Sequence, residues 1–430
     1  MKKLLAIILA AFMALSLFAC QGGTSGGDAS PAGDSPSAAA PSGNTAAVNP
    51  ETTQANTGKT GDQPMDKVGF FDPSFDYAGG KKFKVQYMVS VTSPLYDQFS
   101  SAFAFWAGKM NIDYSPLWAA GGDSDAFLNN LQTFIKQGVN GFLLDPDPAI
   151  FDRVAEIVTE ANVAWMSCMA PAQTDGTKPL LAPYVGFDQV WFGQQMALKL
   201  IDYMNTTWKD VDKSEIGYIA VDYSLAGTLH DREIGAEQVW KDKGNSPDNF
   251  FVADTATVGP TMDGANTTVT AILSAEPQYT HWLISAMFDD AAMGAAAALD
   301  TMGLTDDACV VTVGGTSLQR QWDAGNQDAW RFAMFTPQTI YAEPIIGALY
   351  AFMSGQTTPE EIWPSWVDHS KTDKYARLLL PSYWMDHDNY QKLLEWSDVY
   401  AGSSEYNYDA AGIAKDAFNA RMDIPDSYAG

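Results

Sequence analysis

The sequence predicts an α/β protein with two lobes, each built on a parallel sheet that helices cover on both faces. Short apolar segments alternate with longer amphipathic segments from residue 84 to residue 313, and the alternation restarts near residue 216. The folded part, about 365 residues, is also too long for one hydrophobic core. Two successive sets of elements therefore indicate two similar lobes.

The first set begins at Lys84 and ends at Cys168. Apolar residues between Phe127 and Ile135 recur every three or four positions, which is typical of a helix with one buried face. A short, fully apolar run such as Gly141–Leu144 is typical of a strand buried on both faces. The predicted strands are 84–91, 111–118, 141–144 and 163–168, and the predicted helices are 96–110, the segment around 127–135, and 150–161.

The second set repeats the pattern after residue 216. Ligands of parallel sheets bind outside the carboxyl ends of the strands, so the loops that follow each strand are the places to look for a site. The predicted strands are Ile216–Val221, Phe250–Ala253, Trp282–Ser285 and Cys309–Val313, and the predicted helices are Arg232–Lys243, Met262–Ser274 and Asp289–Met302.

The N-terminal 20 residues have the pattern of an export signal. Two lysines precede a short apolar run that ends at Leu15, and the run is too short to span a bilayer. Leu17-Phe18-Ala19-Cys20 resembles the lipobox of bacterial lipoproteins, which implies that Cys20 becomes the lipidated N-terminus. The alternative is an ordinary secretory signal with a chance cysteine. The protein is expected at the extracytoplasmic face of the cell membrane, held there by its lipid.

The composition limits which structural and functional classes are possible for the rest of the chain. Residues 21–66 are rich in Gly, Ser, Ala, Pro and Thr, so we expect a disordered tether with a reach of roughly 35–40 Å. The formal net charge of −27 argues against binding to nucleic acid or to anionic lipid surfaces. Cys168 and Cys309 lie in apolar segments of different predicted lobes, so they are interpreted as buried free thiols.

Four motifs in the folded part occur in a recognisable order. They are Asp145-Pro146 after the third strand, Asp188-Gln189-Val190-Trp191-Phe192-Gly193, Arg232-Glu233-Ile234-Gly235, and Asp289-Asp290-Ala291-Ala292-Met293-Gly294-Ala295. In the order of its elements and motifs, the chain resembles the ribose/galactose-type periplasmic binding proteins, the type I solute-binding components of ABC importers, from about Lys81 to Asn389.

This resemblance implies two Rossmann-like lobes, joined by three crossovers, that close on a ligand in the cleft between them. The implied N-terminal lobe comprises residues 67–187 and 338–367, and the implied C-terminal lobe comprises residues 188–337 and 368–430. A helix around Thr339–Met353 is expected to return to the first lobe. The crossovers are expected near Phe187-Asp188, Thr336-Pro337 and Asp368-His369.

The resemblance also implies a ligand-binding set. Arg232 matches an arginine that binds sugar hydroxyls, although a local pairing with Asp231 or Glu233 is the alternative. Tyr96 is either an aromatic platform for a sugar or a core residue of the first helix. Asp145 either accepts hydrogen bonds from the ligand or forms a turn before Pro146. The full set is Ser93, Leu95, Tyr96, Asp145, Met169, Arg232, Phe288, Asp289, Gly314 and Phe335.

Several positions depart from the family pattern. Met169-Ala170 stands where the family commonly has an Asp-Arg pair, and Gly314 stands in place of an Asp. Phe288 stands in place of an Asn, and Phe335 stands in place of the Gln at the hinge. A pocket without these polar groups would leave the hydroxyls of a small pentose unpaired. The expected ligand is therefore a modified or less polar sugar, or an amphipathic molecule with a flat face. Trp118, Trp191 and Met262 are candidates to line the pocket.

No pattern of an enzyme is found in the folded region. The four histidines lack metal-ligand spacing on a common helix, and there is no nucleophile elbow or phosphate-binding loop. We therefore expect no catalysis, no metal and no cofactor. The expected partners of this monomer are a small solute, most plausibly a carbohydrate, and an ABC permease. The alternatives are a sensory receptor for a chemoreceptor or histidine kinase, or a carbohydrate-active enzyme of the envelope.

Overall fold

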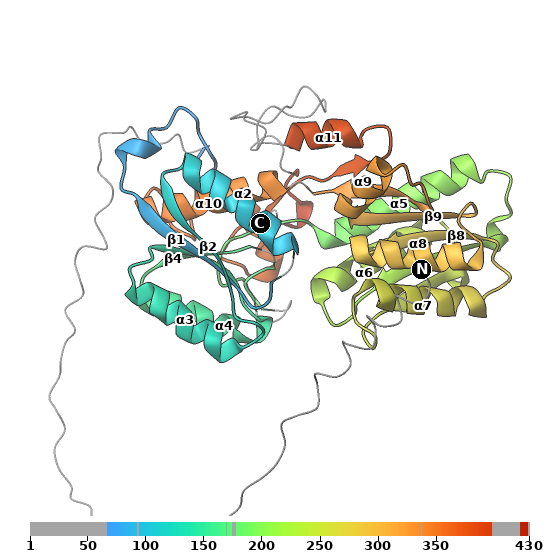
Figure 1. Cartoon of the computed structure of the whole chain (residues 1–430), viewed down its shortest axis with the longest axis horizontal. Helices are drawn as coiled ribbons and strands as arrows, with labels where there is room; N and C mark the ends of the chain where they lie inside the picture. The colour runs from blue at the N-terminus through green and yellow to red at the C-terminus, as the bar shows by residue number, and fades with distance from the viewer. Residues whose placement is uncertain are drawn as a thin grey trace, which may run out of the picture. The chain divides into compact units, whose positions relative to one another are not determined.

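The computed structural model describes residues 67–92, 94–168, 170–173, 178–336, 338–397 and 422–428 (Figure 1). The predicted signal with Cys20, the predicted tether, Ser93 and Met169 lie outside these ranges. In the described ranges, no helix is both long enough and apolar enough to cross a membrane.

The first lobe is built on a six-stranded sheet whose described strand pairs are all parallel. β3 is buried along its whole length, as its uninterrupted apolar run predicts. In spatial order the strands are β11 (Arg377–Leu379), β5 (Tyr184–Gly186), β4 (Ala164–Ser167), β3 (Gly141–Asp145), β1 (Phe83–Val89) and β2 (Ile112–Ala119).

Two pairs of helices cover the two faces of this sheet. α2 (Pro94–Lys109) packs beside α10 (Gln338–Ser354) on one face, and α3 (Ser124–Lys136) and α4 (Phe151–Glu160) lie on the other (Figure 1). α3 buries Phe127 on the predicted face, and the Asp123 side chain caps its first turn by accepting a hydrogen bond from the Ala126 N–H. The predicted return of the helix around residues 339–353 to the first lobe is confirmed by α10.

The second lobe has a sheet of the same kind, which confirms the predicted repetition. Its strands are parallel except for β12, which pairs antiparallel with β10. In spatial order they are β12 (Tyr383–Met385), β10 (Trp330–Phe335), β9 (Ala308–Gly314), β8 (His281–Ala286), β6 (Ile216–Asp222) and β7 (Phe250–Asp254).

Successive residues of β6 point to opposite faces of the second sheet. Tyr218 and Ala220 pack in the same buried cluster as Phe192 of α5 and Trp240 of α6. The other face carries α7 and α8, which pack closely on each other. The helices of this lobe are α5 (Gln189–Thr207), α6 (Gly227–Asp242), α7 (Met262–Ala275), α8 (Asp289–Met302), α9 (Thr316–Asp323) and α11 (Tyr390–Ser397).

The third crossover differs from the prediction. The chain passes from the first sheet to the second after β5, returns after β10, and crosses again between β11 and β12. The expected crossover at Asp368-His369, and the assignment of all residues 368–430 to the second lobe, are therefore wrong. The segment before β11 is held to the first lobe because Asp373 accepts hydrogen bonds from the Leu180 N–H at 2.9 Å and from Arg377 at 2.6 Å.

Both described cysteines are free and buried, which confirms their interpretation as free thiols. Cys168 directly follows β4 of the first sheet, and Cys309 lies in β9 of the second. Burial raises the pKa of the Cys309 thiol to about 12, so this thiol is uncharged at neutral pH.

Candidate functional site

Each sheet has a switch point, where the connections from neighbouring strands run in opposite directions. In the first sheet it lies between β1 and β3, and in the second between β6 and β8. Ligands of open α/β sheets bind at such points, outside the carboxyl ends of the strands. The residues around the two switch points form the candidate site, and we call them the first edge and the second edge.

Asp145 is the central residue of the first edge. Its carboxylate is buried at the end of β3, where it accepts hydrogen bonds from the Tyr87 hydroxyl at 2.8 Å and from the Cys168 N–H at 3.3 Å. Its backbone carbonyl accepts a further bond from the Ser90 N–H at 2.9 Å. Asp145 therefore joins the ends of β1, β3 and β4, a role that neither sequence-based interpretation included.

The aromatic residues predicted at the first edge pack against other aromatic side chains of the first lobe. Tyr96 on α2 is half-buried, with its ring centroid 6.4 Å from that of Tyr87, and burial raises the pKa of its hydroxyl. Trp118 at the end of β2 packs its ring against Phe127 and Phe134 of α3, at 6.3 Å from each. Tyr96 is thus close to Asp145 in the first lobe, and its contact with a ligand stays a prediction. The side chain of Leu95 is outside the described part.

Arg232 is the central cation of the second edge. Its Nε donates to Gln189 Oε1 at 2.8 Å, its Nη1 donates to the Met287 carbonyl, and its guanidinium lies 5.5 Å from the centroid of the Phe192 ring. Within the described residues it forms no ion pair with Asp231 or Glu233, the local partners considered for it. Burial lowers the pKa of Arg232 to about 10, so it stays charged at neutral pH.

Asp289 begins α8 and organises the loop that follows β9. Its carboxylate accepts hydrogen bonds from the Gly315 N–H at 2.6 Å and from the Ser317 N–H at 2.7 Å. Burial raises the pKa of Asp289, and these two bonds offset only part of that rise. Gly314 has a φ of 121°, and a Cβ there would lie 2.6 Å from the Asp289 carboxylate. In this chain the loop therefore favours a glycine at position 314, because another side chain would be strained there and would clash with Asp289.

Replacing Asp289 with alanine should lower the free energy of unfolding by about 2 kcal/mol, because two backbone N–H groups lose their acceptor. The matched control is Asp290→Ala, at the exposed neighbouring position, which should cost at most about 1 kcal/mol through the helix dipole. Urea unfolding of both variants measures the difference. Equal midpoints for the two variants would show that Asp289 does not support the loop.

Phe288 and Phe335, the two phenylalanines of the predicted ligand-binding set, both pack in the hydrophobic core. Phe288 precedes α8 in an extended conformation and packs against buried residues. Phe335 ends β10 and is buried, and its carbonyl accepts a hydrogen bond from the Ser382 hydroxyl at 2.9 Å. Trp191 packs against Phe192, with ring centroids 5.8 Å apart, whereas Met262 is exposed at the start of α7. The structure therefore brings Arg232, Phe288, Asp289 and Gly314 together around one switch point.

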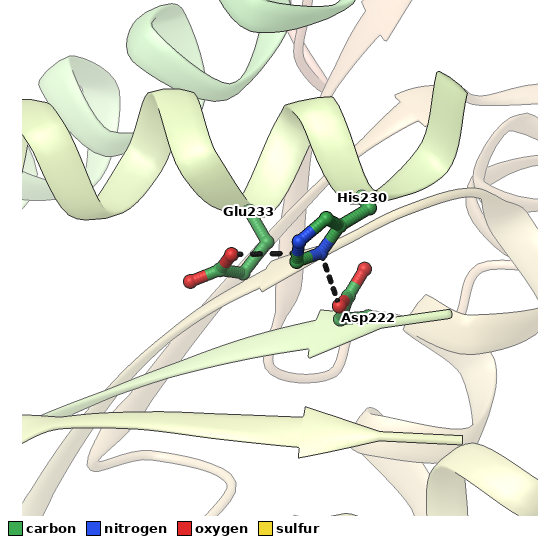
Figure 2. Close-up of side chains that lie close together, drawn as sticks. All are labelled: Asp222, His230 and Glu233. Carbon is green, nitrogen blue, oxygen red and sulfur yellow. Dashed lines mark hydrogen bonds and ion pairs between the residues drawn. The ribbon is translucent and has the colours of Figure 1, made fainter. Parts of the chain in front are cut away.

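Sequence reasoning missed one cluster at the second edge. His230 and Glu233 lie on α6 and point toward Asp222, the last residue of β6 (Figure 2). His230 Nδ1 lies 2.8 Å from Asp222 Oδ2 and 3.7 Å from Glu233 Oε2. The available signal was that Asp222 ends an apolar strand next to the switch point.

Two carboxylates share one imidazole in this cluster, and both carboxylates are largely buried. Burial lowers the pKa of His230, but its hydrogen bond to Asp222 and the nearby carboxylates raise the pKa overall. Burial and the charge of Asp222 raise the pKa of Glu233. The side chain of Asp222 is only 1% exposed. These carboxylates therefore lie where a cationic group or ion would relieve unfavourable burial.

Comparisons with known proteins agree with this architecture. A family model described as the periplasmic binding protein domain matches residues 88–356, well over half of the chain. This is a family of binding proteins, which agrees with the expectation that the chain is not an enzyme. Among curated protein sequences, none matches the chain significantly.

Solved structures share the fold at low sequence identity. The periplasmic ribose ABC transporter of Conexibacter woesei is 14% identical, with a TM-score of 0.58 over 77% of this chain and 97% of its own. A solute-binding protein of Actinobacillus succinogenes with bound D-allose is 15% identical, with a TM-score of 0.55 over 72% and 99%. One from Bacillus halodurans with bound myo-inositol is 14% identical, with a TM-score of 0.53 over 73% and 97%.

Proposed function

The chain belongs to the periplasmic binding protein family, and on that premise we propose that it is the extracytoplasmic receptor of an ABC importer for a sugar or modified sugar. The observation that carries the proposal is the gathering of polar side chains at the switch point of each sheet. Structures of the same fold contain or are named for ribose, D-allose and myo-inositol, which supports a polyhydroxylated ligand.

The two edges support a ligand less polar than a simple pentose. Asp145, Arg232 and Asp289 already have hydrogen-bond partners within their own lobes, which fixes their orientation before a ligand arrives. By the family resemblance, Phe288 and Phe335 stand where polar residues are common, so these two positions offer a ligand no hydrogen-bonding side chain. A sugar with a flat apolar face, or one that lacks some of its hydroxyls, would leave the fewest groups unpaired.

Binding would act through the equilibrium between an open and a closed arrangement of the lobes. A ligand that contacts Tyr96 and Asp145 of the first lobe together with Arg232 and Asp289 of the second favours the closed arrangement. The closed form would then dock on the permease and release its ligand there. The crossovers after β5, after β10 and between β11 and β12 would absorb the movement.

Uptake of labelled sugars by a deletion strain tests this function. The strain should lose uptake of one sugar or a small related group, and the gene in trans should restore it. Normal uptake of every sugar in the panel, together with a lost tactic or transcriptional response to one of them, would show a sensory receptor instead of a transport protein.

The proposed location depends on lipidation of Cys20, followed by a tether over residues 21–66. Cys20→Ser should move the protein from the membrane fraction to a soluble extracytoplasmic fraction, because one acyl anchor chain contributes about 0.8 kcal/mol per buried methylene. Cys309→Ser, which alters a buried thiol, is the matched control and should stay with the membrane. Membrane retention of the Cys20 variant would contradict the anchor.

A further inference from the structure

Three potential metal ligands meet at the second edge. The Nδ1 atom of His230, one oxygen of Asp222 and one oxygen of Glu233 all lie within 4.8 Å of one another. Figure 2 shows that Asp222 approaches from β6 while His230 and Glu233 approach from neighbouring turns of α6. The residues lie on two packed elements of one lobe, so their arrangement does not depend on the position of the other lobe.

Glu233 is the group that points to a missing ligand. Its side chain is 10% exposed and directed at the cluster, and its closest polar contact there is His230 at 3.7 Å, beyond hydrogen-bonding distance. Among the described residues, no lysine or arginine lies within ion-pair distance of Asp222 or Glu233. In the described residues, His230 is the one basic side chain within ion-pair distance of these two carboxylates, so a bound cation would offset more of the cost of burying them.

We propose that Asp222, His230 and Glu233 bind a divalent transition-metal ion of the Zn²⁺ type. One imidazole nitrogen with two carboxylates is a donor set that such ions accept, with bond lengths of about 2.0–2.2 Å. Ligand atoms around a tetrahedral ion of this size lie about 3.3 Å apart. The two separations from His230, 2.8 Å to Asp222 and 3.7 Å to Glu233, fall on either side of that value, and all three ligand atoms lie within 4.8 Å of one another, so side-chain rotations would have to draw the carboxylates together around the ion.

The surroundings of the three ligands suit this role. The second carboxylate oxygen of Asp222 accepts a hydrogen bond from the Tyr223 N–H at 2.7 Å, which orients the first oxygen toward His230. An incoming ion would replace the proton between His230 Nδ1 and Asp222, and that proton would pass to solvent. Three protein ligands leave a coordination position open for water. Ca²⁺ and Mg²⁺ prefer more numerous oxygen ligands, so they should bind more weakly.

Calorimetric titration with ZnCl₂ tests the site on the full chain, purified without a histidine tag and freed of metal with a chelator. We expect one Zn²⁺ per chain, with affinity at least tenfold lower in Glu233→Gln and in His230→Gln. Glu237→Gln is the matched control, because Glu237 lies one turn further along α6, exposed and paired with Lys241 at 2.8 Å. Wild-type affinity in Glu233→Gln, no binding at all, or equal binding of Mg²⁺ would overturn the proposal.

The absorption spectrum of added Co²⁺ provides a readout that needs no variant. Visible bands of a four- or five-coordinate ion are expected at one equivalent, and they should disappear when Zn²⁺ is added. A spectrum of hydrated Co²⁺ alone would contradict the site. Neither measurement contains a sugar, so a negative result here would leave the proposed transport function untouched.

Discussion

Gly193→Val should prevent folding of the second lobe or lower its free energy of unfolding by more than about 3 kcal/mol. α5 and α6 pack closely at Gly193 and Gly235, with no room for a side chain. A Cβ at Gly193 would overlap the Arg232 carbonyl, and a Cβ at Gly235 would overlap the Val190 carbonyl. The obstructing atoms belong to helix backbones and cannot rotate away, so the helices would have to separate.

The control for this variant is Gly227→Val, at the start of α6, where a Cβ would meet nothing within 4 Å. Both proteins can be compared by urea unfolding followed by tryptophan fluorescence, since Trp240 of α6 is buried in the same cluster. The control should unfold near the wild-type midpoint. A Gly193→Val protein that unfolds cooperatively at that same midpoint would show that α5 and α6 are not in close contact.

Arg232→Ala should weaken binding of the solute at least tenfold and also destabilise the empty protein by about 2–4 kcal/mol. The binding loss follows from the family resemblance, in which this arginine holds ligand hydroxyls. The stability loss follows from the structure, because the variant removes the donors to Gln189 and to the Met287 carbonyl. The two losses have different causes, so stability and affinity are measured separately.

Arg320→Ala, on the exposed side of α9 in the same lobe, is the control for this experiment. Calorimetry on the folded proteins at low temperature reports affinity, and thermal unfolding without ligand reports stability. Wild-type affinity in Arg232→Ala would remove this residue from the site. A wild-type melting temperature would show that its hydrogen bonds within the lobe contribute nothing.

The sequence predicts most of the fold because the signals are local. Gly141–Leu144 and Ile216–Val221 are uninterrupted apolar runs, and both are buried interior strands of their sheets. Short strands have no such signal. β5, β11 and β12 are three residues long, and their pairing depends on contacts with residues that are distant in the sequence, which is why the third crossover is misplaced.

The candidate site is harder to predict from the sequence than the fold. Arg232 and Asp289 stand out through their motifs, but the sequence does not show that Arg232 pairs with Gln189 of another motif or that Asp289 pairs with Ser317, because these partners lie on other elements. Asp222 and His230 are eight positions apart on a strand and a helix, so metal-ligand spacing on a single helix does not detect them. The side chains are visible in the sequence, whereas their juxtaposition results from the packing of α6 on β6.

Native mass spectrometry of the gently purified protein, titrated with pentoses, hexoses, deoxy sugars and inositols, tests the central claim most directly. The account predicts a one-to-one complex with at least one of these compounds, or with a co-purified carbohydrate, and loss of that complex in Arg232→Ala. If no compound formed a complex above the level of nonspecific adducts, and no carbohydrate co-purified, the chain would not be a sugar receptor.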